Sequence, residues 1–206
     1  LTSIINYVDL LKKEDIPNPK AQEYIEVLDR KSQRLKKLTE DLVEASKAST
    51  GALSVNRERI GMNQLLSQAL GEYEEKLVAA GLTPVTELPQ EEVFVRADGR
   101  HLWRILDNLM GNCVKYAMAG TRVYLDLVRW DGQVTLSVKN ISAGQLNIPP
   151  EQLMERFVRG DESRTTEGSG LGLSIARSLT ELQGGTFRLE VDGDLFKAVV
   201  SFPEMK

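Results

Sequence analysis

The chain has 206 residues, of which 41% are hydrophobic, and a formal net charge of −4. This length allows one substantial core and a second, smaller module. Lys and Arg are scattered among Asp and Glu, so the chain lacks the basic face of a nucleic-acid binder. Its single cysteine, Cys113, cannot form an internal disulfide, and no apolar run approaches the length of about 20 residues that spans a bilayer. We therefore expect a soluble protein of a reducing compartment with no nucleic-acid partner.

Residues 1–50 predict an antiparallel helical hairpin. The segment LTSIINYVDLLKK has apolar residues at helical spacing, EDIPNP supplies a turn, and a long helix is expected from Pro19 to Ser49. Two helices alone cannot enclose a core, so the hairpin either packs against the rest of the chain or dimerises into a four-helix bundle, which the length of its seam favours. The seam repeats every seven residues, at Ala21, Leu28, Leu35 and Leu42, with companions at Tyr24, Lys31, Leu38 and Ala45.

Residues 51–206 form the second predicted domain, in which helical and strand patterns alternate. Helices are predicted over residues 61–81, ended by Gly81, over 99–117, capped by Asp98, and from about Leu171. Strands are predicted over residues 82–88, 92–98, 121–128, 134–140, 186–191 and 196–202, with a hairpin turn at Asp131-Gly132. The fold class is therefore α+β, a two-layer α/β sandwich with a mixed sheet and helices on one face, preceded by the helical hairpin.

A glycine cluster, EGSGLGLSIARS, stands directly before the last predicted helix. Its spacing fits neither the dinucleotide motif G-x-G-x-x-G nor a P-loop, because Leu173 follows Gly172 where a P-loop has Lys. Glycines nevertheless let backbone N–H groups approach a polyphosphate, and the helix start adds its positive dipole end. Taken alone, the cluster is equally typical of a structural turn.

A second candidate element is the helical segment RILDNLMGNCVKYA. Asn108, Asn112, Lys115 and Tyr116 fall on one helical stripe, beside an apolar stripe formed by Leu102, Ile105, Leu106 and Leu109. An amide oxygen suits Mg²⁺, a lysine can meet phosphates, and an aromatic ring can cover a base. The alternative is a solvated polar face.

These segments resemble the sequence boxes of sensor histidine kinases. NLMGNCVKYA resembles their asparagine box, ERFVRGDESR their phenylalanine box and GSGLGLSIARSLTELQGG their second glycine box, in the family's order and spacing. LTSIINYVDLL resembles the stretch just after the phospho-acceptor motif. The resemblance implies that residues 1–50 are the dimerisation and phosphotransfer hairpin. Residues 51–206 would then be the catalytic ATP-binding domain of the superfamily shared with type II topoisomerases, mismatch-repair ATPases and heat-shock chaperone ATPases.

The resemblance also implies ATP and Mg²⁺ as cofactors, with roles for individual residues. Asn112 would hold Mg²⁺, Lys115 would contact phosphate and Tyr116 would face the adenine side. Residues 142–167 would form a mobile lid over ATP. The implied nucleotide-contacting residues are Asn108, Asn112, Lys115, Tyr116, Asn140, Ser142, Gly144, Arg159, Arg164, Gly168, Ser169, Gly170, Leu171 and Gly172, with Arg159 or Arg164 reaching the γ-phosphate.

Two departures from the family pattern stand out. The first glycine box, normally Asp-x-Gly-x-Gly, reads NISAG, so Asn140 replaces the acid and Ser142 a glycine. An amide oxygen can still accept a hydrogen bond from the adenine amino group, less tightly than a carboxylate, unless the box and ATP binding have both decayed. The acceptor motif His-Glu-x-x-Thr-Pro is also absent, and we expect it upstream of Leu1. The only histidine, His101, is expected to be an ordinary surface residue.

The predicted function is that of an ATP- and Mg²⁺-dependent protein-histidine kinase of a two-component system. It would pass the γ-phosphate to a hairpin histidine outside this chain and then to an aspartate of a response regulator. The expected partners are a second copy, through the hairpin, and a receiver domain, with a membrane reached only through upstream regions. The expected location is the cytoplasm, as the soluble part of a membrane-anchored bacterial sensor. The alternatives are an ATP-driven conformational clamp, which needs an acidic general base near the asparagine box, and a nucleotide-free dimerisation scaffold.

Overall fold

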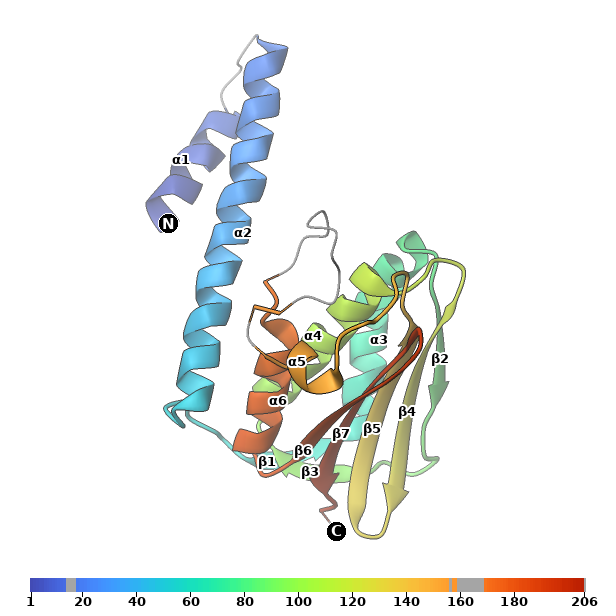
Figure 1. Cartoon of the computed structure of the whole chain (residues 1–206). Helices are drawn as coiled ribbons and strands as arrows, with labels where there is room; N and C mark the ends of the chain where they lie inside the picture. The colour runs from blue at the N-terminus through green and yellow to red at the C-terminus, as the bar shows by residue number, and fades with distance from the viewer. Residues whose placement is uncertain (14–17, 156, 159–168, 206) are drawn as a thin grey trace. The chain divides into compact units, whose positions relative to one another are not determined.

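A computed structural model describes residues 1–13, 18–155, 157, 158 and 169–205 of the chain. The chain divides into two compact units, Leu1–Glu44 and Ala45–Lys206, whose elements are labelled in Figure 1. The division falls inside the second helix, whereas the predicted domain boundary follows that helix. Where the functional domains separate stays a prediction.

The first unit is built from α1 (Thr2–Lys13) and most of α2 (Pro19–Ser49). α2 begins at a proline, and the side-chain Oδ1 of Asn18 accepts a hydrogen bond from the backbone of Lys20 at 3.0 Å, as expected of a helix cap. The Lys12 ammonium lies 2.6 Å from the Asp29 carboxylate and links the two helices. The predicted helical hairpin is therefore confirmed. Its buried apolar residues are Ile5, Val8 and Ile25.

A large apolar surface of the first unit is exposed. Leu28 and Leu35, both in the predicted seam, are each 51% exposed. We call this surface the hairpin face. Its residues are Ile4, Tyr7, Leu10, Leu11, Tyr24, Val27, Leu28, Leu35, Leu42 and Val43.

The second unit contains a mixed five-stranded sheet in the order β2-β4-β5-β7-β6. β2 runs parallel to β4, and the other neighbours are antiparallel. The strands are β2 (Thr83–Glu87), β4 (Arg122–Trp130), β5 (Gln133–Ile141), β6 (Thr186–Asp192) and β7 (Leu195–Pro203). The turn between β4 and β5 has positive φ at Asp131 and Gly132, as the Asp-Gly signal predicts.

One strand was missed and another lies outside the predicted sheet. β1 (Glu58–Gly61) pairs with β3 (Phe94–Ala97) in a separate two-stranded antiparallel sheet. β1 has the sequence ERIG, too short and polar to show strand periodicity. Its Arg59 guanidinium lies 3.4 Å from the centre of the Phe94 ring, a contact that the sequence pattern does not reveal.

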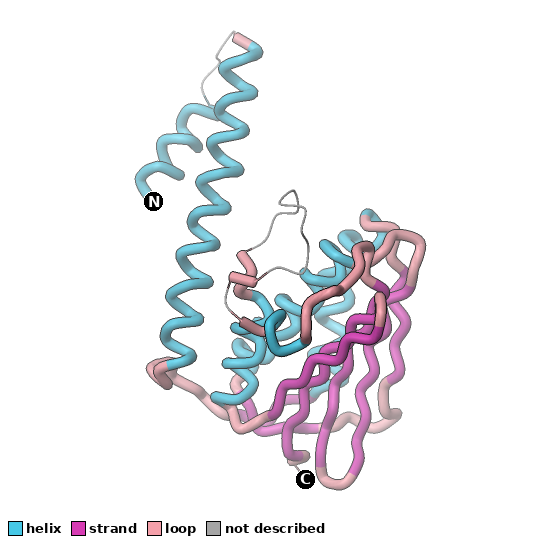
Figure 2. The backbone as a smooth tube through the Cα atoms, in the orientation of Figure 1, coloured by secondary structure: helices cyan, strands magenta, loops and turns pink. Residues whose placement is uncertain are grey.

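Three long helices lie on one face of the five-stranded sheet, as the ribbon and tube views show (Figures 1 and 2). They are α3 (Met62–Ala79), α4 (Gly99–Tyr116) and α6 (Gly172–Leu182), and a short α5 (Pro150–Leu153) falls in the stretch predicted as a lid. The side chain of Asp98 caps α4, accepting from the backbone of Arg100 at 3.0 Å. Gly81 follows α3 with a φ of +69°. The predicted start of α4 at Asp98 and the predicted end of α3 at Gly81 are thus confirmed.

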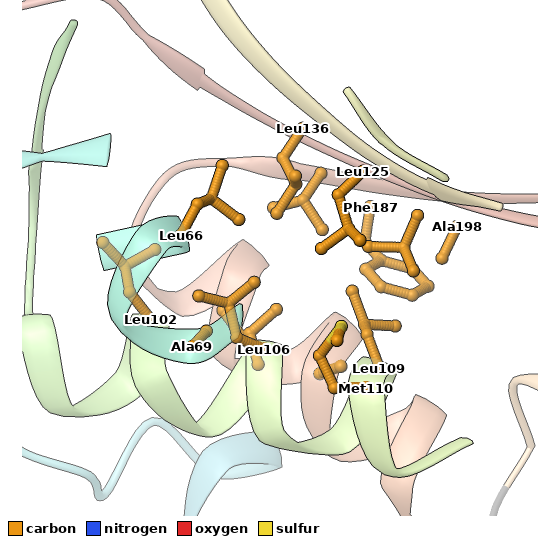
Figure 3. Close-up of a cluster of buried hydrophobic side chains, with 14 of the residues drawn as sticks. Leu66, Ala69, Leu102, Leu106, Leu109, Met110, Leu125, Leu136, Phe187 and Ala198 are labelled. Carbon is orange, nitrogen blue, oxygen red and sulfur yellow. The ribbon is translucent and has the colours of Figure 1, made fainter. Parts of the chain in front are cut away.

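The core of the second unit fills the space between these helices and the sheet (Figure 3). On β4, Val123, Leu125 and Leu127 are buried while Tyr124 and Asp126 are partly exposed, the period of two expected of a sheet with one covered face. The predicted two-layer sandwich is confirmed. Core residues drawn in Figure 3 include Leu66, Ala69, Leu102, Leu106, Leu109, Met110, Leu125, Leu136, Phe187 and Ala198.

Candidate functional site

Helix α4 presents the two stripes that its sequence predicts. The apolar stripe is buried: Leu102, Ile105, Leu106 and Leu109 are each at most 2% exposed. On the polar stripe, Asn108, Asn112 and Tyr116 are partly buried and Lys115 is exposed. One side of α4 therefore holds the core while the other keeps amide, ammonium and phenol groups within reach of a ligand.

The asparagine stripe meets the glycine loop at Asn108. A Cβ added to Gly172, the first residue of α6, would lie 3.2 Å from the Asn108 Oδ1. The Asn108 Nδ2 is buried and has no hydrogen-bond partner among the described residues. Since buried amide groups are normally satisfied, this nitrogen indicates an unfilled contact beside the start of α6. The sequence motifs, 64 positions apart at Asn108 and Gly172, are thus brought together.

The glycine loop itself has backbone geometry that requires glycine. Gly170 has a φ of +68°, and a Cβ there would lie 2.8 Å from the carbonyl carbon of Phe157. The carbonyl of Gly170 accepts a hydrogen bond from the backbone of Phe157 at 2.9 Å. Ser169 Oγ accepts from the backbone of Leu171, whose side chain is fully buried. The loop is therefore held against the phenylalanine-containing segment, while the predicted site residues Arg159, Arg164 and Gly168 lie outside the described residues.

The C-terminal end of α4 is bonded to the chain that follows β5. The carbonyl of Tyr116 accepts from the backbone of Ala143 at 2.8 Å, and the carbonyl of Ile141 accepts from Met118 at 2.8 Å. Ser142 forms an isolated bridge with Ala117 and is buried. These bonds place Tyr116 next to Ser142, as the predicted site needs. Gly144 is exposed, and a Cβ there would meet no atom within 4 Å, so packing does not explain this glycine.

Asn140, the residue in place of the family's acid, is buried at the end of β5 with an exposed fraction of 4%. Its Oδ1 accepts a hydrogen bond from the thiol of Cys113 on α4, with a sulfur–oxygen distance of 3.6 Å. Cys113 is fully buried, and burial raises the pKa of its thiol to about 12. The amide oxygen is therefore bonded to the Cys113 thiol on α4, and its role as an acceptor for adenine stays a prediction.

A buried carboxylate fixes the other end of α4. Asp98 is 2% exposed, and its carboxylate accepts hydrogen bonds from the backbone of Asn56 and from the backbone and guanidinium of Arg100. Its backbone N–H donates to Gln183 Oε1 at 2.7 Å. Burial acts to raise the pKa of Asp98, but the Arg100 guanidinium and the two backbone N–H groups outweigh it and hold that pKa well below its usual range.

The contacts of His101 and Cys113 are two features of the site that the sequence did not predict. His101 is a partly buried residue, with a side chain that is 12% exposed and an Nε2 that lies 3.1 Å from the carbonyl oxygen of Ser54. The sequence excludes an internal disulfide for Cys113 but gives no sign that its thiol is the hydrogen-bond partner of the Asn140 side chain. The buried side of α4 could have been predicted from helical spacing, but its pairing with a strand 27 residues later could not.

Clusters of acidic, thiol or imidazole ligands do not explain this site. Within the described part of the chain, no three His, Cys, Asp or Glu side chains come together as a metal site. Among the helices described, none is long and apolar enough to cross a membrane.

Comparison with known proteins identifies the class. Residues 97–204 match the family model described as histidine kinase-, DNA gyrase B- and HSP90-like ATPase, and residues 1–51 match that of the His Kinase A phospho-acceptor domain. The sensor histidine kinase RppB of Synechocystis sp. is 28% identical over 193 residues, covering 92% of this chain and 42% of RppB. The chain thus spans less than half of that relative.

Two solved structures have the same fold. Full-length ShkA in complex with AMPPNP has a TM-score of 0.84 at 23% identity, covering 98% of this chain and 42% of ShkA. ThkA in complex with the response regulator TrrA has a TM-score of 0.71 at 21% identity, covering 99% of this chain and 57% of that one.

The fold and the glycine and asparagine segments define an ATPase domain of the kind that histidine kinases use. The chain belongs to the histidine kinase-, DNA gyrase B- and HSP90-like ATPase family. The chain also matches the phospho-acceptor domain, so it has both domains of the sensor histidine kinase pair. The resemblance to sensor histidine kinases is therefore confirmed.

Proposed function

We propose that this chain is the ATP- and Mg²⁺-dependent kinase region of a two-component sensor histidine kinase. The observation that carries the proposal is the contact between the glycine loop and the asparagine helix, where Gly172 lies against Asn108. The family match supports ATP as the nucleotide, and the ShkA complex with AMPPNP supports a nucleotide at this fold. Catalysis in phosphoryl transfer is mainly positioning and charge stabilisation, which this arrangement suits.

The phosphate side of the site is assigned to α4 and the glycine loop. Backbone N–H groups of residues 168–172 would cradle the triphosphate at the start of α6, with Ser169 and Leu171 shaping the loop. Lys115, exposed on the polar stripe, would contact phosphate. Asn112, one turn after Asn108, offers one hard oxygen to Mg²⁺, which takes its remaining ligands from phosphates and water. The bound ion would neutralise phosphate charge, and this donor set fits it.

The base side is assigned to the region where α4 meets the end of β5. Tyr116, Asn140, Ser142 and Gly144 would surround the adenine. Backbone hydrogen bonds and an isolated bridge already join the end of α4 to the chain that follows β5. Arg159 and Arg164 stay predicted contacts of the γ-phosphate. A lid formed by this segment would exclude water, so that phosphate passes to an acceptor side chain and is not hydrolysed.

The acceptor is proposed to be a histidine outside these 206 residues. His101 is the only histidine of the sequence, and its contacts with Ser54 and Asp98 engage it at the start of α4. The phosphate would pass from the acceptor to an aspartate of a response regulator, a partner type that the ThkA–TrrA complex supports. The exposed hairpin face supports a homodimer. A cytoplasmic location and upstream membrane attachment are part of the same proposal.

A clamp ATPase is the less favoured alternative, because the nearest acid on α4 is engaged elsewhere. Asp107 Oδ1 accepts from the Tyr73 hydroxyl at 2.5 Å, and its Oδ2 lies 3.3 Å from the Arg104 guanidinium. The Tyr73 contact directs one carboxylate oxygen toward α3, and Arg104, one turn earlier on α4, engages the other oxygen. This geometry supports the kinase over a hydrolase that needs a general base here.

The test is a titration of the chain with ATP, with and without Mg²⁺, and with Asn112→Ala. We expect the wild type to bind Mg·ATP and the variant to lose the Mg²⁺-dependent part of the affinity while keeping its fold. Asn6→Ala, at an exposed hairpin position, is the control and should bind as the wild type does. Unchanged Mg·ATP affinity in folded Asn112→Ala would remove the metal assignment, and no nucleotide binding by the wild type would favour the scaffold.

Kinase activity is tested by incorporation of label from ATP. We expect no acid-labile label on this chain, and label on a protein that adds the acceptor histidine upstream. Acid-labile label on the present chain that His101→Ala abolishes would contradict both the role of His101 and the position of the acceptor.

A further inference from the structure

The buried amide of Asn140 has hydrogen-bonding capacity that the described residues do not use. An asparagine side chain offers two N–H donors and an oxygen with two lone pairs, and buried groups of this kind are normally satisfied. The structure gives this side chain the Cys113 thiol as its partner, at 3.6 Å. The rest of its capacity is left for a ligand in the proposed base site.

Cys113 can pair with either end of that amide. Because burial raises its pKa to about 12, the sulfur stays a neutral thiol at physiological pH. A thiol is a weak donor through S–H and a weak acceptor through sulfur. The oxygen and NH₂ ends of an amide have nearly the same size, so a half-turn about the last side-chain bond exchanges them. The thiol can then satisfy whichever end faces α4.

An ionised carboxylate lacks this freedom, because both of its oxygens only accept. A carboxylate can accept a hydrogen bond from an amino group at position 6 of a purine. A carbonyl oxygen at the same position has no proton to donate, and its partial negative charge is repelled by the carboxylate. An amide can accept from the amino group in one orientation and donate to the carbonyl in the other. We propose that the Asn140–Cys113 pair makes the base site permissive for purine triphosphates with either an amino group or a carbonyl oxygen at position 6. The inference rests on the proposed function, in which Asn140 faces the base.

The experiment compares the Kd values of ATP and ITP, which carry the same ribose and triphosphate and present an amino group or a carbonyl at position 6. For the wild-type chain with Mg²⁺ we expect the two values to agree within about threefold, because each base finds a complementary amide end. In Asn140→Asp we expect ATP to be preferred by at least about tenfold, because the carboxylate leaves the carbonyl unpaired. Asn6→Asp, which adds the same charge at an exposed hairpin position, should keep the wild-type ratio.

Thermal unfolding without nucleotide will show whether Asn140→Asp folds. If it does not, the ratio of the ATP and ITP Kd values of the wild-type chain still tests the inference. A tenfold or larger preference of the wild type for either nucleotide overturns the inference and leaves the proposed function standing. A folded Asn140→Asp with an unchanged ratio also overturns it, because position 140 would then not select the base. Binding of neither nucleotide to the wild type overturns the proposed function and the inference together.

Discussion

The two units of this chain treat their large apolar side chains in opposite ways. Among the described residues of the first unit, eleven large apolar side chains are exposed and three hydrophobic ones are buried. In the second unit, a continuous core runs from α3 and α4 to the sheet, and its fully buried members include Leu66, Ile105, Leu106 and Ile175. The second unit thus contains its own source of stability, whereas the hairpin must bury its face against another surface.

This difference teaches what a periodic sequence can indicate. A seven-residue seam predicts a helix with one apolar face, and the structure confirms the helix. The seven-residue spacing does not identify the surface that packs against that apolar face. Three predictions sharpen the comparison, ordered by their expected effect on the stability of the second unit. Both tryptophans, Trp103 and Trp130, lie in that unit, so intrinsic fluorescence reports its unfolding alone.

The largest effect is expected from truncating the core. Leu109→Ala should lower the free energy of unfolding of the second unit by about 2 to 5 kcal/mol, since it removes a side chain that is 1% exposed and leaves a cavity. The measurement is urea unfolding followed by tryptophan fluorescence. Leu28→Ala, the matched change on the hairpin face, should leave this transition in place. Similar shifts in both variants would contradict the separation into two units.

A smaller effect is expected at Asp98. The pKa of this carboxyl is lowered in the folded state, so its contribution to stability is present above its unfolded pKa of about 4 and is lost as the pH falls toward the folded pKa. Asp98→Asn should lower the free energy of unfolding at pH 7 by about 1 to 3 kcal/mol, because hydrogen bonds to a charged acceptor are weakened.

The pH dependence separates this effect from simple loss of packing. The gap between wild type and Asp98→Asn should narrow as the pH falls below 4, because the wild-type carboxyl is then being protonated. Glu74→Gln, at an exposed position of α3, should show no comparable gap at any pH. A gap that stays constant down to pH 2 would show that the charge of Asp98 is not what stabilises the unit.

Local signals in the sequence predicted much of the fold. Asp98 and Gly81 mark helix ends through hydrogen bonds and backbone angles that act within a few residues. Asp131-Gly132 forms a hairpin turn that requires positive φ. β1 was missed because its stability comes from pairing with β3 across 32 intervening residues, those between Gly61 and Phe94. Its own four residues carry no periodic pattern.

The candidate site shows the same limit. Helical spacing places Asn108, Asn112, Lys115 and Tyr116 on one stripe, because that relation depends on a single helix. The direction of the Asn140 amide depends on how α4 packs on β5, and the partner at Cys113 follows from that packing. Sequence motifs therefore predicted which residues gather at the site, while the hydrogen-bonding roles left to each of them required the fold.

The smallest effect on the second unit, and the largest on assembly, is expected from a charge on the hairpin face. Leu28→Glu should weaken self-association at least about tenfold, because a dimer would have to bury or displace an ionised carboxylate within its apolar contact. The unfolding free energy of the second unit should change by less than about 0.5 kcal/mol. Asn6→Asp adds the same charge at an exposed polar position of α1 and should leave both quantities unchanged. Sedimentation velocity over a concentration series measures the association. A wild type that stays monomeric throughout, or two variants that associate equally, would show that the hairpin face is covered by something other than a second copy of this chain.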